Sequence, residues 1–333
     1  MGNASTVFIT GTGRSGTNIT KAIFAQNSQC ATLPFEYRFT VDPGGVIDFL
    51  NQYSSSWSPF MADKRLREFE KYLLSLGQRN ESEFAASQWL KEVDPRAENI
   101  TPYAYSGWEL EKWFPGYKKH VTALMNQLVD YKYAACWPGS DSLSESNMMY
   151  FGSPKTTEEL VPLLSSFLDS CFQSFLDKKK GRVFVEDNTW SLLHADDLLK
   201  LVPKGKIIHV IRDPRDVVSS LMKQRWTPSD LDQVVNWYKA VMSTWKNQRS
   251  KLMDGQFMEI KLEDIISNTE EVIQNVCTFA GLEYEVAMTR IDLSKSNSGR
   301  FKTELSNDDI INVEDSLSDI LSEYNYVSNN FWT

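Results

Sequence analysis

The sequence has few of the residues that build metal or redox centres. Only 4 cysteines and 3 histidines occur among its 333 residues. The cysteines are widely spaced and form no C-x-x-C pair, so neither a zinc site nor a dithiol redox motif is indicated. The histidines, His120, His194 and His209, do not have metal-ligand spacing. These absences predict a reduced, intracellular protein without a metal centre.

Basic residues and long apolar runs are also scarce. The chain carries 35 Lys and Arg against 44 Asp and Glu, a net charge of −9, which argues against a nucleic-acid surface and against a heavily sulfated or phosphorylated polymer as substrate. No uninterrupted apolar stretch reaches the ~18 residues of a membrane helix. The first expected strand begins at Val7, which leaves no room for a signal peptide. We therefore expect a cytoplasmic protein with neither membrane nor nucleic acid as partner.

A glycine-rich turn lies near the N-terminus. The string VFITGTGRSGTN, residues 7–18, runs an apolar strand into a turn that opens a helix. Gly11, Gly13 and Gly16 allow a tight turn with inward-pointing N–H groups, and the following helix adds the positive end of its dipole. The turn therefore predicts a binding site for a phosphate or sulfate group.

Two general fingerprints compete for this turn. As G-x-G-x-x-G, residues 11–16 match the loop of a Rossmann-type NAD(P)-dependent dehydrogenase or epimerase, and Glu36 lies where a ribose-binding acid is expected. As G-x-x-x-x-G-K-[ST], the outer glycines fit, but Thr17 and Asn18 replace the lysine and the hydroxyl of a P-loop small-molecule kinase. The kinase is disfavoured, and a dehydrogenase would also need a catalytic pair such as Tyr-x-x-x-Lys, which the chain lacks at that spacing.

A second motif, KIIHVIRDPRDVVSS at residues 206–220, distinguishes these alternatives better. Its β-branched run reads as a buried strand, and Pro214 then starts a helix. Arg212 is thereby placed at the carboxyl end of a strand, where open α/β sheets bind their ligands and where a guanidinium can grip a phosphate. The alternative for Arg212 is a surface salt bridge with Asp213 or Asp216.

With these two motifs the chain resembles the sulfotransferases that use 3′-phosphoadenosine 5′-phosphosulfate (PAPS) and release 3′-phosphoadenosine 5′-phosphate (PAP). The resemblance implies that the first loop holds the 5′-phosphosulfate, that Arg212 and Ser220 hold the 3′-phosphate, and that no metal is needed. A late segment, KSNSGRFKTEL at residues 295–305, resembles the part that closes over the nucleotide. The implied cofactor-binding residues are Gly11, Thr12, Gly13, Arg14, Ser15, Gly16, Thr17, Asn18, Arg212, Ser220, Gly299, Arg300 and Lys302.

Catalytic groups follow from the same resemblance. PFEYRF, residues 34–39, is similar to the Glu-x-Arg trio of the tyrosylprotein branch, which would make Glu36 the general base and Arg38 a substrate-binding residue. Arg14 would stabilise charge on the sulfuryl group. At residues 185–193 the chain departs from the family, because Asp187 and its neighbour stand where many members carry a catalytic lysine or histidine. Asp187 is therefore the second candidate base.

Each of these residues also has a plainer interpretation. Glu36 suits a solvated loop, and the basic pair Arg300 and Lys302 suits a solvated patch. The Asp-Asn-Thr run at 187–189 suits the cap of a helix that Trp190 begins. A nucleotide-binding module without catalytic activity also remains open.

The pattern of elements predicts an α/β fold, a central parallel sheet flanked by helices in a P-loop-like arrangement, with a largely helical insertion. We expect one sulfotransferase domain over residues 1–333. Its cofactor-binding core is residues 1–50 and 182–305, the insertion is 51–181 and lines the acceptor site, and 306–333 form a C-terminal helix and tail. The acceptor is expected to be a small molecule, with a sugar or peptide hydroxyl still open, and Trp190 to contact it. The oligomeric state is left open.

Overall fold

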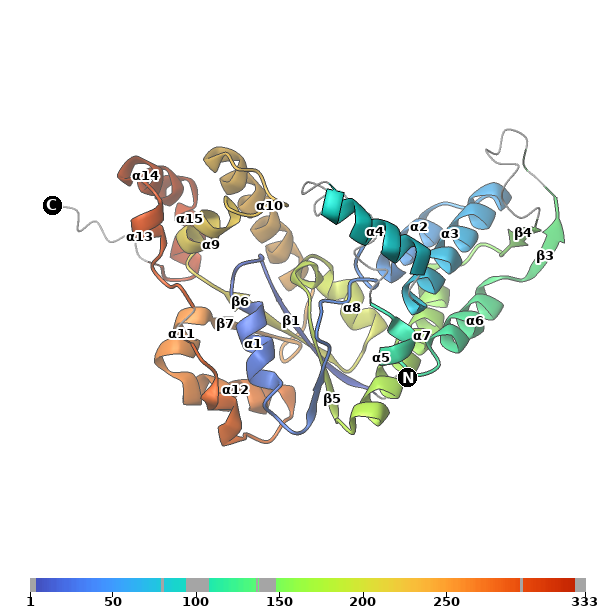
Figure 1. Cartoon of the computed structure of the whole chain (residues 1–333), viewed down its shortest axis with the longest axis horizontal. Helices are drawn as coiled ribbons and strands as arrows, with labels where there is room; N and C mark the ends of the chain where they lie inside the picture. Colours follow the sequence, from blue (N-terminus) through green and yellow to red (C-terminus); the bar gives the residue numbers. More distant parts are fainter. Residues whose placement is uncertain are drawn as a thin grey trace. The chain divides into compact units, whose positions relative to one another are not determined.

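The computed structural model describes residues 4–78, 81–93, 108–135, 137, 148–293 and 296–326. Contacts divide the chain into two compact units. Unit 1 comprises residues 1–5, 33–184 and 197–204, and unit 2 comprises residues 6–32, 185–196 and 205–333. The elements of both can be followed along the colour gradient of Figure 1.

A five-stranded sheet contains every strand that the sequence predicts. Its order is β2 (Cys30–Thr32), β5 (Val183–Asp187), β1 (Ser5–Gly11), β6 (Gly205–Ile211) and β7 (Phe257–Lys261). β1 pairs in parallel with β6, and β6 pairs in parallel with β7. Almost every residue of β1 and β6 is buried, which is typical of central strands covered on both faces. The predicted parallel sheet with flanking helices is confirmed. The sequence analysis missed β2, because three residues are too few for a periodic signal.

Unit 2 places two helices directly after strands of this sheet. α1 (Thr17–Phe24) follows β1, and α9 (Pro214–Leu221) follows β6 with its proline in the first turn and Asp213 as its N-cap. The remaining helices of unit 2 are η2 (Thr189–His194), α10 (Leu231–Arg249), α11 (Leu262–Ser267), α12 (Thr269–Ala280), η3 (Val286–Arg290), α13 (Phe301–Glu304), α14 (Asn307–Ser316) and α15 (Ser318–Glu323). Helix α8 (Ala195–Leu201) runs from unit 2 into unit 1.

Unit 1 is mainly helical. Its helices are α2 (Val46–Ser55), α3 (Pro59–Gly77), α4 (Glu81–Val93), α5 (Leu110–Trp113), α6 (Tyr117–Leu128) and α7 (Thr157–Lys179). An antiparallel hairpin of β3 (Tyr131–Ala134) and β4 (Met148–Phe151) interrupts them, and the sequence analysis did not anticipate it. β3 is mostly exposed, so it lacks the apolar alternation by which a strand is recognised. The domain boundaries expected from the sequence stay a prediction.

An aromatic cluster forms the core of unit 1. The ring of Tyr37 lies 4.9 Å from that of Phe39 and 5.8 Å from that of Phe184, with Phe172 at 6.0 Å. Each of these rings is buried. Burial of such large rings supplies several kcal/mol in total. Tyr37 and Phe39 therefore anchor the segment PFEYRF, residues 34–39, in the core of unit 1.

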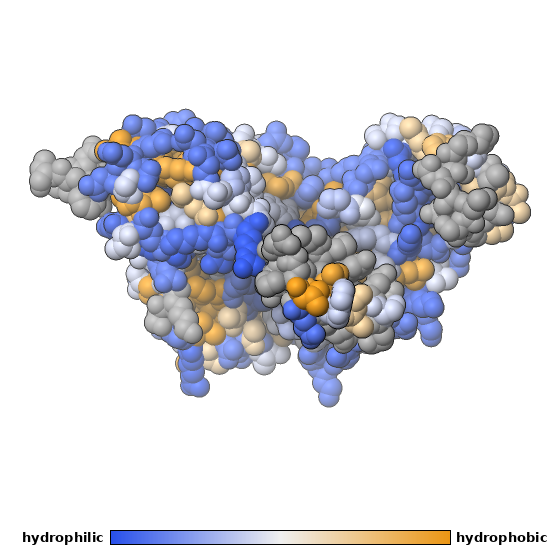
Figure 2. All heavy atoms as spheres, turned by 45° about the horizontal axis from the view of Figure 1, so that its top comes forward, coloured by the Kyte–Doolittle hydropathy of each residue, from blue (hydrophilic) through white to orange (hydrophobic). Residues whose placement is uncertain are grey.

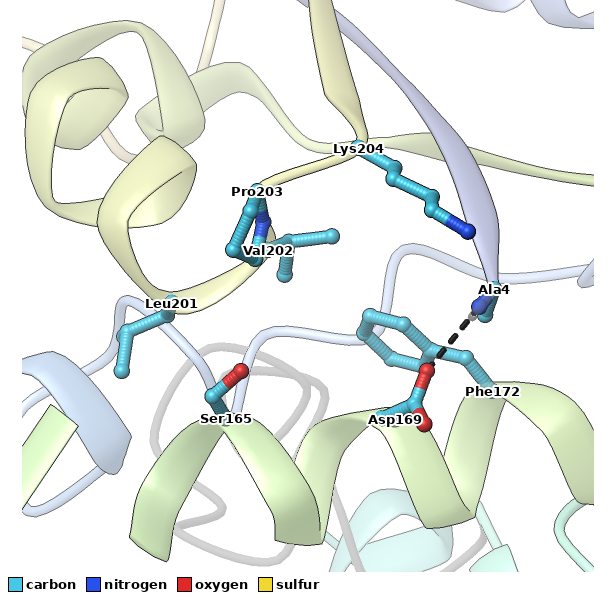
Figure 3. Close-up of a pocket in the computed structure, with 8 residues that line it drawn as sticks. All are labelled: Ala4, Ser165, Asp169, Phe172, Leu201, Val202, Pro203 and Lys204. Carbon is cyan, nitrogen blue, oxygen red and sulfur yellow. Dashed lines mark hydrogen bonds between the residues drawn. The ribbon is translucent and has the colours of Figure 1, made fainter. Parts of the chain in front are cut away.

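A small cavity lies where the chain enters β1. Figure 3 shows Asp169 on α7 pointing toward Ala4, whose N–H donates a hydrogen bond of 2.9 Å to the Asp169 carboxylate. The cavity measures about 10 Å³, room for roughly one water molecule. A larger groove of about 500 Å³ is lined by residues of α5 and α6, among them Lys118 and Lys119. Neither contains a residue of the glycine-rich loop.

The surface agrees with the charged composition. Figure 2 shows mainly hydrophilic residues on the face it draws, with apolar residues in scattered patches. Within the described ranges, no helix combines the length and the apolar character needed to cross a membrane.

Candidate functional site

The loop between β1 and α1 has a strained backbone. Gly13, Arg14 and Gly16 have φ angles of 76°, 59° and 109°. The left-handed conformation costs a non-glycine residue such as Arg14 about 1–2 kcal/mol. Strain of this kind is retained where a site needs a particular backbone shape.

The N–H groups of this loop are available to a ligand. Among the described residues, none accepts a hydrogen bond from the N–H of Gly13, Arg14, Ser15 or Gly16. Gly16 is the N-cap of α1 and offers no side chain to the first turn of the helix. Four open amides at the positive end of a helix are the arrangement that binds a phosphate or a sulfate group.

Arginines from two distant parts of the sequence meet at this loop. Nε of Arg14 donates a hydrogen bond of 3.0 Å to the hydroxyl of Ser220 near the end of α9. Arg212, at the end of β6 and only 5% exposed, donates a hydrogen bond of 3.1 Å to the carbonyl of Arg14. Burial, followed by the positive charges of Arg300 and Arg212, lowers the pKa of Arg14. The charges of Arg300 and Arg212 therefore disfavour the charged form of Arg14, and an anion bound beside Arg14 would offset that effect.

Asp216 ties the late glycine-basic segment to α9. Its fully buried carboxylate accepts hydrogen bonds from the N–H of Gly299 at 2.7 Å and from the N–H of Phe301 at 2.9 Å. The same carboxylate lies 3.3 Å from the guanidinium of Arg212. The salt bridge that the plainer interpretation of Arg212 required is present, but it is buried and orders the site.

Glu304 orients the third arginine. Nε and an Nη of Arg300 donate hydrogen bonds of 2.8 and 2.6 Å to the two Glu304 oxygens, and Lys223 lies 2.6 Å from one of them. The hydrogen bond from Arg300 is the main reason why the pKa of Glu304 is about 2. Glu304 therefore stays charged at neutral pH and holds Arg300 in place.

Two buried polar atoms of the site have no partner. The hydroxyl of Ser15 and Nε of Arg212 are inaccessible to solvent, and neither forms a hydrogen bond with any described residue. A buried polar group without a partner costs about 1–3 kcal/mol. Such a cost is offset when a bound group supplies the missing hydrogen bonds, so the site fits an anionic ligand with several oxygens.

Asp187 forms a buried ion pair beside the loop. One of its oxygens lies 2.7 Å from Nζ of Lys21 on α1, and its side chain is 1% exposed. Its other oxygen is buried without a partner among the described residues. The neighbouring Asn188, rather than Asp187, caps the helix that follows, by accepting a hydrogen bond of 2.9 Å from the N–H of Trp190.

The other residues expected at the site lie as follows. Lys302 is exposed on α13, with its ammonium 5.9 Å from the ring centroid of Phe301. Glu36 and Arg38 belong to unit 1; Glu36 is half-buried, and Nε of Arg38 donates a hydrogen bond of 3.1 Å to Asp42. The structure thus brings Arg14, Ser220, Arg212, Gly299 and Arg300 together within unit 2, whereas Glu36 and Arg38 belong to the other unit.

Sequence reasoning missed two parts of the site. Lys21 carries no motif, and only its position one turn beyond Thr17 on α1 could have directed attention to it. Asp216 was considered only as a surface partner of Arg212, although its place in the first turn of α9 could have indicated an inward-pointing carboxylate. In the folded chain Lys21 pairs with Asp187, and Asp216 pairs with Arg212.

Comparison with known proteins identifies the family. A model of the sulfotransferase family matches residues 6–286, and the chain therefore belongs to that family. Among curated proteins, the 3-beta-hydroxysteroid sulfotransferase of Cavia porcellus is 28% identical over 91 residues, which are 23% of this chain and 32% of that enzyme. The match thus spans about a third of that relative's length.

Solved structures that resemble this chain at low sequence identity include a sulfotransferase domain, a sulfotransferase and a retinol dehydratase. The sulfotransferase domain from the curacin biosynthetic pathway is 12% identical, with a TM-score of 0.42 over 95% of this chain and 97% of that one. Sulfotransferase STF9 from Mycobacterium avium is 9% identical, with a TM-score of 0.41 over 97% and 77%. Retinol dehydratase, solved with androsterone and inactive cofactor PAP, is 12% identical, with a TM-score of 0.37 over 98% and 83%.

Proposed function

We propose that this chain transfers a sulfuryl group from PAPS to a hydroxyl or amine of a small-molecule acceptor. One observation carries the proposal: a strained loop with four open amides carries Arg14, and the positive charges of Arg300 and Arg212 act on that arginine. Membership of the sulfotransferase family supports it. PAPS and PAP carry anionic groups at both ends of the ribose, and a site with several cations suits them.

We assign the two ends of the nucleotide to different residues. The loop of residues 11–18, including the unpartnered hydroxyl of Ser15, would hold the 5′-phosphosulfate. Arg212, whose Nε lacks a partner, would hold the 3′-phosphate together with Ser220. Gly299, Arg300 and Lys302 would close over the nucleotide. Asp216 would keep that segment beside Arg212 through its two backbone hydrogen bonds.

PAPS supplies an activated sulfuryl group when it is bound. During the transfer, negative charge develops on the sulfuryl oxygens and on the bridging oxygen, and Arg14 and the loop amides would face these atoms. Hydrogen-bond donors that are already in place supply a large part of the rate enhancement in such reactions. The transferring sulfuryl carries a single negative charge, so the proposal includes no metal.

We assign the acceptor's proton to Glu36. Asp187 is the weaker candidate because Lys21 occupies one of its oxygens, and protonating the carboxylate would break that buried ion pair. Replacing Glu36 with Gln should lower turnover by about 10²- to 10⁴-fold and leave PAP binding unchanged. Arg38, in the same segment as Glu36, would contact the acceptor.

A thermal-shift panel tests the class of enzyme. PAP, NAD, FAD and ATP are each added to the purified chain in the presence of EDTA. A ligand at 100 times its Kd stabilises the fold by about 2.7 kcal/mol, enough for a shift of several degrees. We expect PAP alone to give this shift. Selective stabilisation by NAD would instead support the dehydrogenase alternative and contradict the proposal.

A further inference from the structure

Six lysines of unit 1 form a basic surface on this acidic chain. They lie at the ends of α5, α6 and α7, and Figure 1 shows α5 beside the other two helices. Nζ of Lys178 donates a hydrogen bond to the carbonyl of Lys112, and Nζ of Lys179 lies 5.5 Å from the ring centroid of Trp113, so α7 contacts α5 here. We call this surface the lysine patch. It comprises six exposed residues, Lys112, Lys118, Lys119, Lys178, Lys179 and Lys180.

The fold does not balance the charges of the lysine patch. Within the described ranges, none of its six ammonium groups forms an ion pair with a carboxylate. Glu111 lies close by on α5, but both of its oxygens are used by the backbone. They accept hydrogen bonds from the N–H of Gly116 at 3.1 Å and from the N–H of Lys118 at 2.8 Å. The patch therefore presents its positive charge to solvent.

Two lysines of the patch lie where they oppose the helix that carries them. α6 begins at Tyr117, so Lys118 and Lys119 are in its first turn, at the positive end of its dipole, and that turn contains no acidic residue. Lys178 and Lys179, in contrast, lie in the last turn of α7, where a cation is favourable. The first two lysines also line the groove of about 500 Å³ on α5 and α6. The stability of α6 does not account for them, whereas a role in binding an acidic surface does.

Unit 2 carries a surface of the opposite sign. No Lys or Arg follows Lys302 in the sequence, and residues 304–323 contain seven Asp and Glu residues. Asp308 and Asp315 lie two turns apart on one face of α14, and Asp319 lies on α15. These three carboxylates, the acidic face, are exposed, and none forms an ion pair within the part of the chain that the structure describes. Asp315 is in the last turn of α14, at the negative end of the dipole, with no basic residue in that turn.

We propose that the lysine patch of one copy of this chain binds the acidic face of a second copy. The two surfaces have opposite charge, and each contains charges that are unpaired and lie at the unfavourable end of a helix. The net charge of −9 does not prevent the contact, because charges more than about 10 Å apart are largely screened in 0.1 M salt. Since the patch and the face are different surfaces, the contact is head-to-tail.

The strength of this contact follows from its exposure. Exposed ion pairs are individually weak and are screened by salt, so the association is weak, reversible and dependent on salt. It does not depend on the proposed sulfuryl transfer, because none of the charged residues of the patch or of the acidic face has been assigned to the nucleotide or to the acceptor.

Sedimentation velocity of the purified chain tests the contact in about 0.1 M and about 1 M NaCl. We expect the wild type to self-associate at the lower salt concentration and to be monomeric at the higher one. Lys118→Glu with Lys119→Glu should weaken self-association by about tenfold or more, and so should Asp308→Lys with Asp315→Lys. An equimolar mixture of these two double variants should associate again, because each reversed surface then meets a surface of opposite sign.

A charge-matched variant provides the control. Lys64→Glu with Lys251→Glu changes the net charge by the same amount at two exposed lysines outside the patch, and it should self-associate as the wild type does. Zero-length carbodiimide cross-linking of a mixture of isotopically heavy and light chains then distinguishes contacts between copies from contacts within one copy. We expect cross-links from Lys118 or Lys119 to the acidic face of the other isotopic form.

The remaining outcomes overturn the inference. A wild type that stays monomeric in about 0.1 M NaCl at up to about 1 mM protein does not bind itself through these surfaces. Cross-links confined to single copies would place the contact within one chain. If the mixture of the two double variants does not recover, the patch and the acidic face do not bind each other. Binding of a poly-glutamate peptide by a monomeric wild type would assign the patch to another protein, and binding of phosphatidylserine vesicles would assign it to a membrane.

Discussion

Arg212 offers the most discriminating test of the nucleotide site. It is 5% exposed, and its guanidinium reaches the carbonyl of Arg14 and the carboxylate of Asp216 at 3.1 and 3.3 Å. Removing it altogether would leave a buried carboxylate without its counter-charge, which destabilises a fold by about 3–5 kcal/mol. Arg212→Lys is the better perturbation, because it keeps the charge and removes the planar fork of donors.

The measured quantity is the ratio of the Kd for adenosine 5′-phosphate to the Kd for PAP. The two nucleotides differ only in the 3′-phosphate, so a general loosening of the fold changes both and leaves the ratio unchanged. A hydrogen bond to a charged group contributes about 1.5–3 kcal/mol, or roughly 10- to 150-fold in Kd. We expect Arg212→Lys to lower the ratio by at least about tenfold, measured by isothermal titration calorimetry.

A second arginine of unit 2 provides the control. Arg249, the last residue of α10, lies 3.0 Å from Glu259 on β7 and takes no part in the arginine cluster. Arg249→Lys should leave the ratio of the two dissociation constants as it is in the wild type. An unchanged ratio in Arg212→Lys would show that Arg212 does not bind the 3′-phosphate and would refute the assignment.

Three further predictions concern the framework of unit 2. Gly16→Ala should destabilise the fold by about 1–3 kcal/mol in urea denaturation, because φ is 109° and the new Cβ would lie 2.8 Å from Leu262. Lys21→Met should cost about 3 kcal/mol in the same assay, because it leaves the Asp187 carboxylate buried without a counter-charge. Burial would raise the pKa of Glu259, but hydrogen bonds from His209 and Trp245 and the charges of His209 and Arg249 together outweigh it and hold that pKa at about 2. The stability that Glu259 provides is therefore complete above about pH 4.5 and is lost as pH falls toward 2, so Glu259→Gln should cost at most about 3 kcal/mol at pH 7 and little near pH 2.

Each of these has its own control. Gly255→Ala changes a glycine at φ 79° with no atom within 4 Å of the new Cβ, so it should cost only the backbone strain and less than Gly16→Ala. The double variant Lys21→Met with Asp187→Leu should recover part of the stability that Lys21→Met loses. If Lys21→Met were as stable as the wild type, the buried ion pair of Lys21 and Asp187 would not stabilise the fold. A cost of Glu259→Gln that does not vary with pH would show that its charge is not what stabilises the fold.

Local chemistry explains why much of the fold was predictable. Residues 206–220 contain a β-branched strand, a proline that starts a helix and a polar cap, and each of these signals acts within a few residues. The structure accordingly has β6 and α9 where they were expected. The β3–β4 hairpin was missed because its strands are only four residues long and partly exposed.

The site was predictable to the extent that its residues form motifs. Arg14, Arg212 and Arg300 were selected one motif at a time, and the structure brings them together. The ion pair of Lys21 with Asp187 and the contact of Trp226 with Gly13 depend on the packing of separate elements, and for Lys21 only its position one turn beyond Thr17 gave any sequence signal. Tertiary contacts of this kind determine the chemistry of a site and leave at most a weak signal in the sequence.

The most direct test of the central claim is acceptor-dependent release of PAP from PAPS by the purified chain in EDTA. We expect the wild type to release PAP only when an acceptor such as 2-naphthol is present. Arg14→Ala should mainly lower kcat, whereas Arg212→Lys should mainly weaken nucleotide binding. No release of PAP with any hydroxyl or amine acceptor, together with selective binding of NAD, would contradict sulfuryl transfer as the function of this loop.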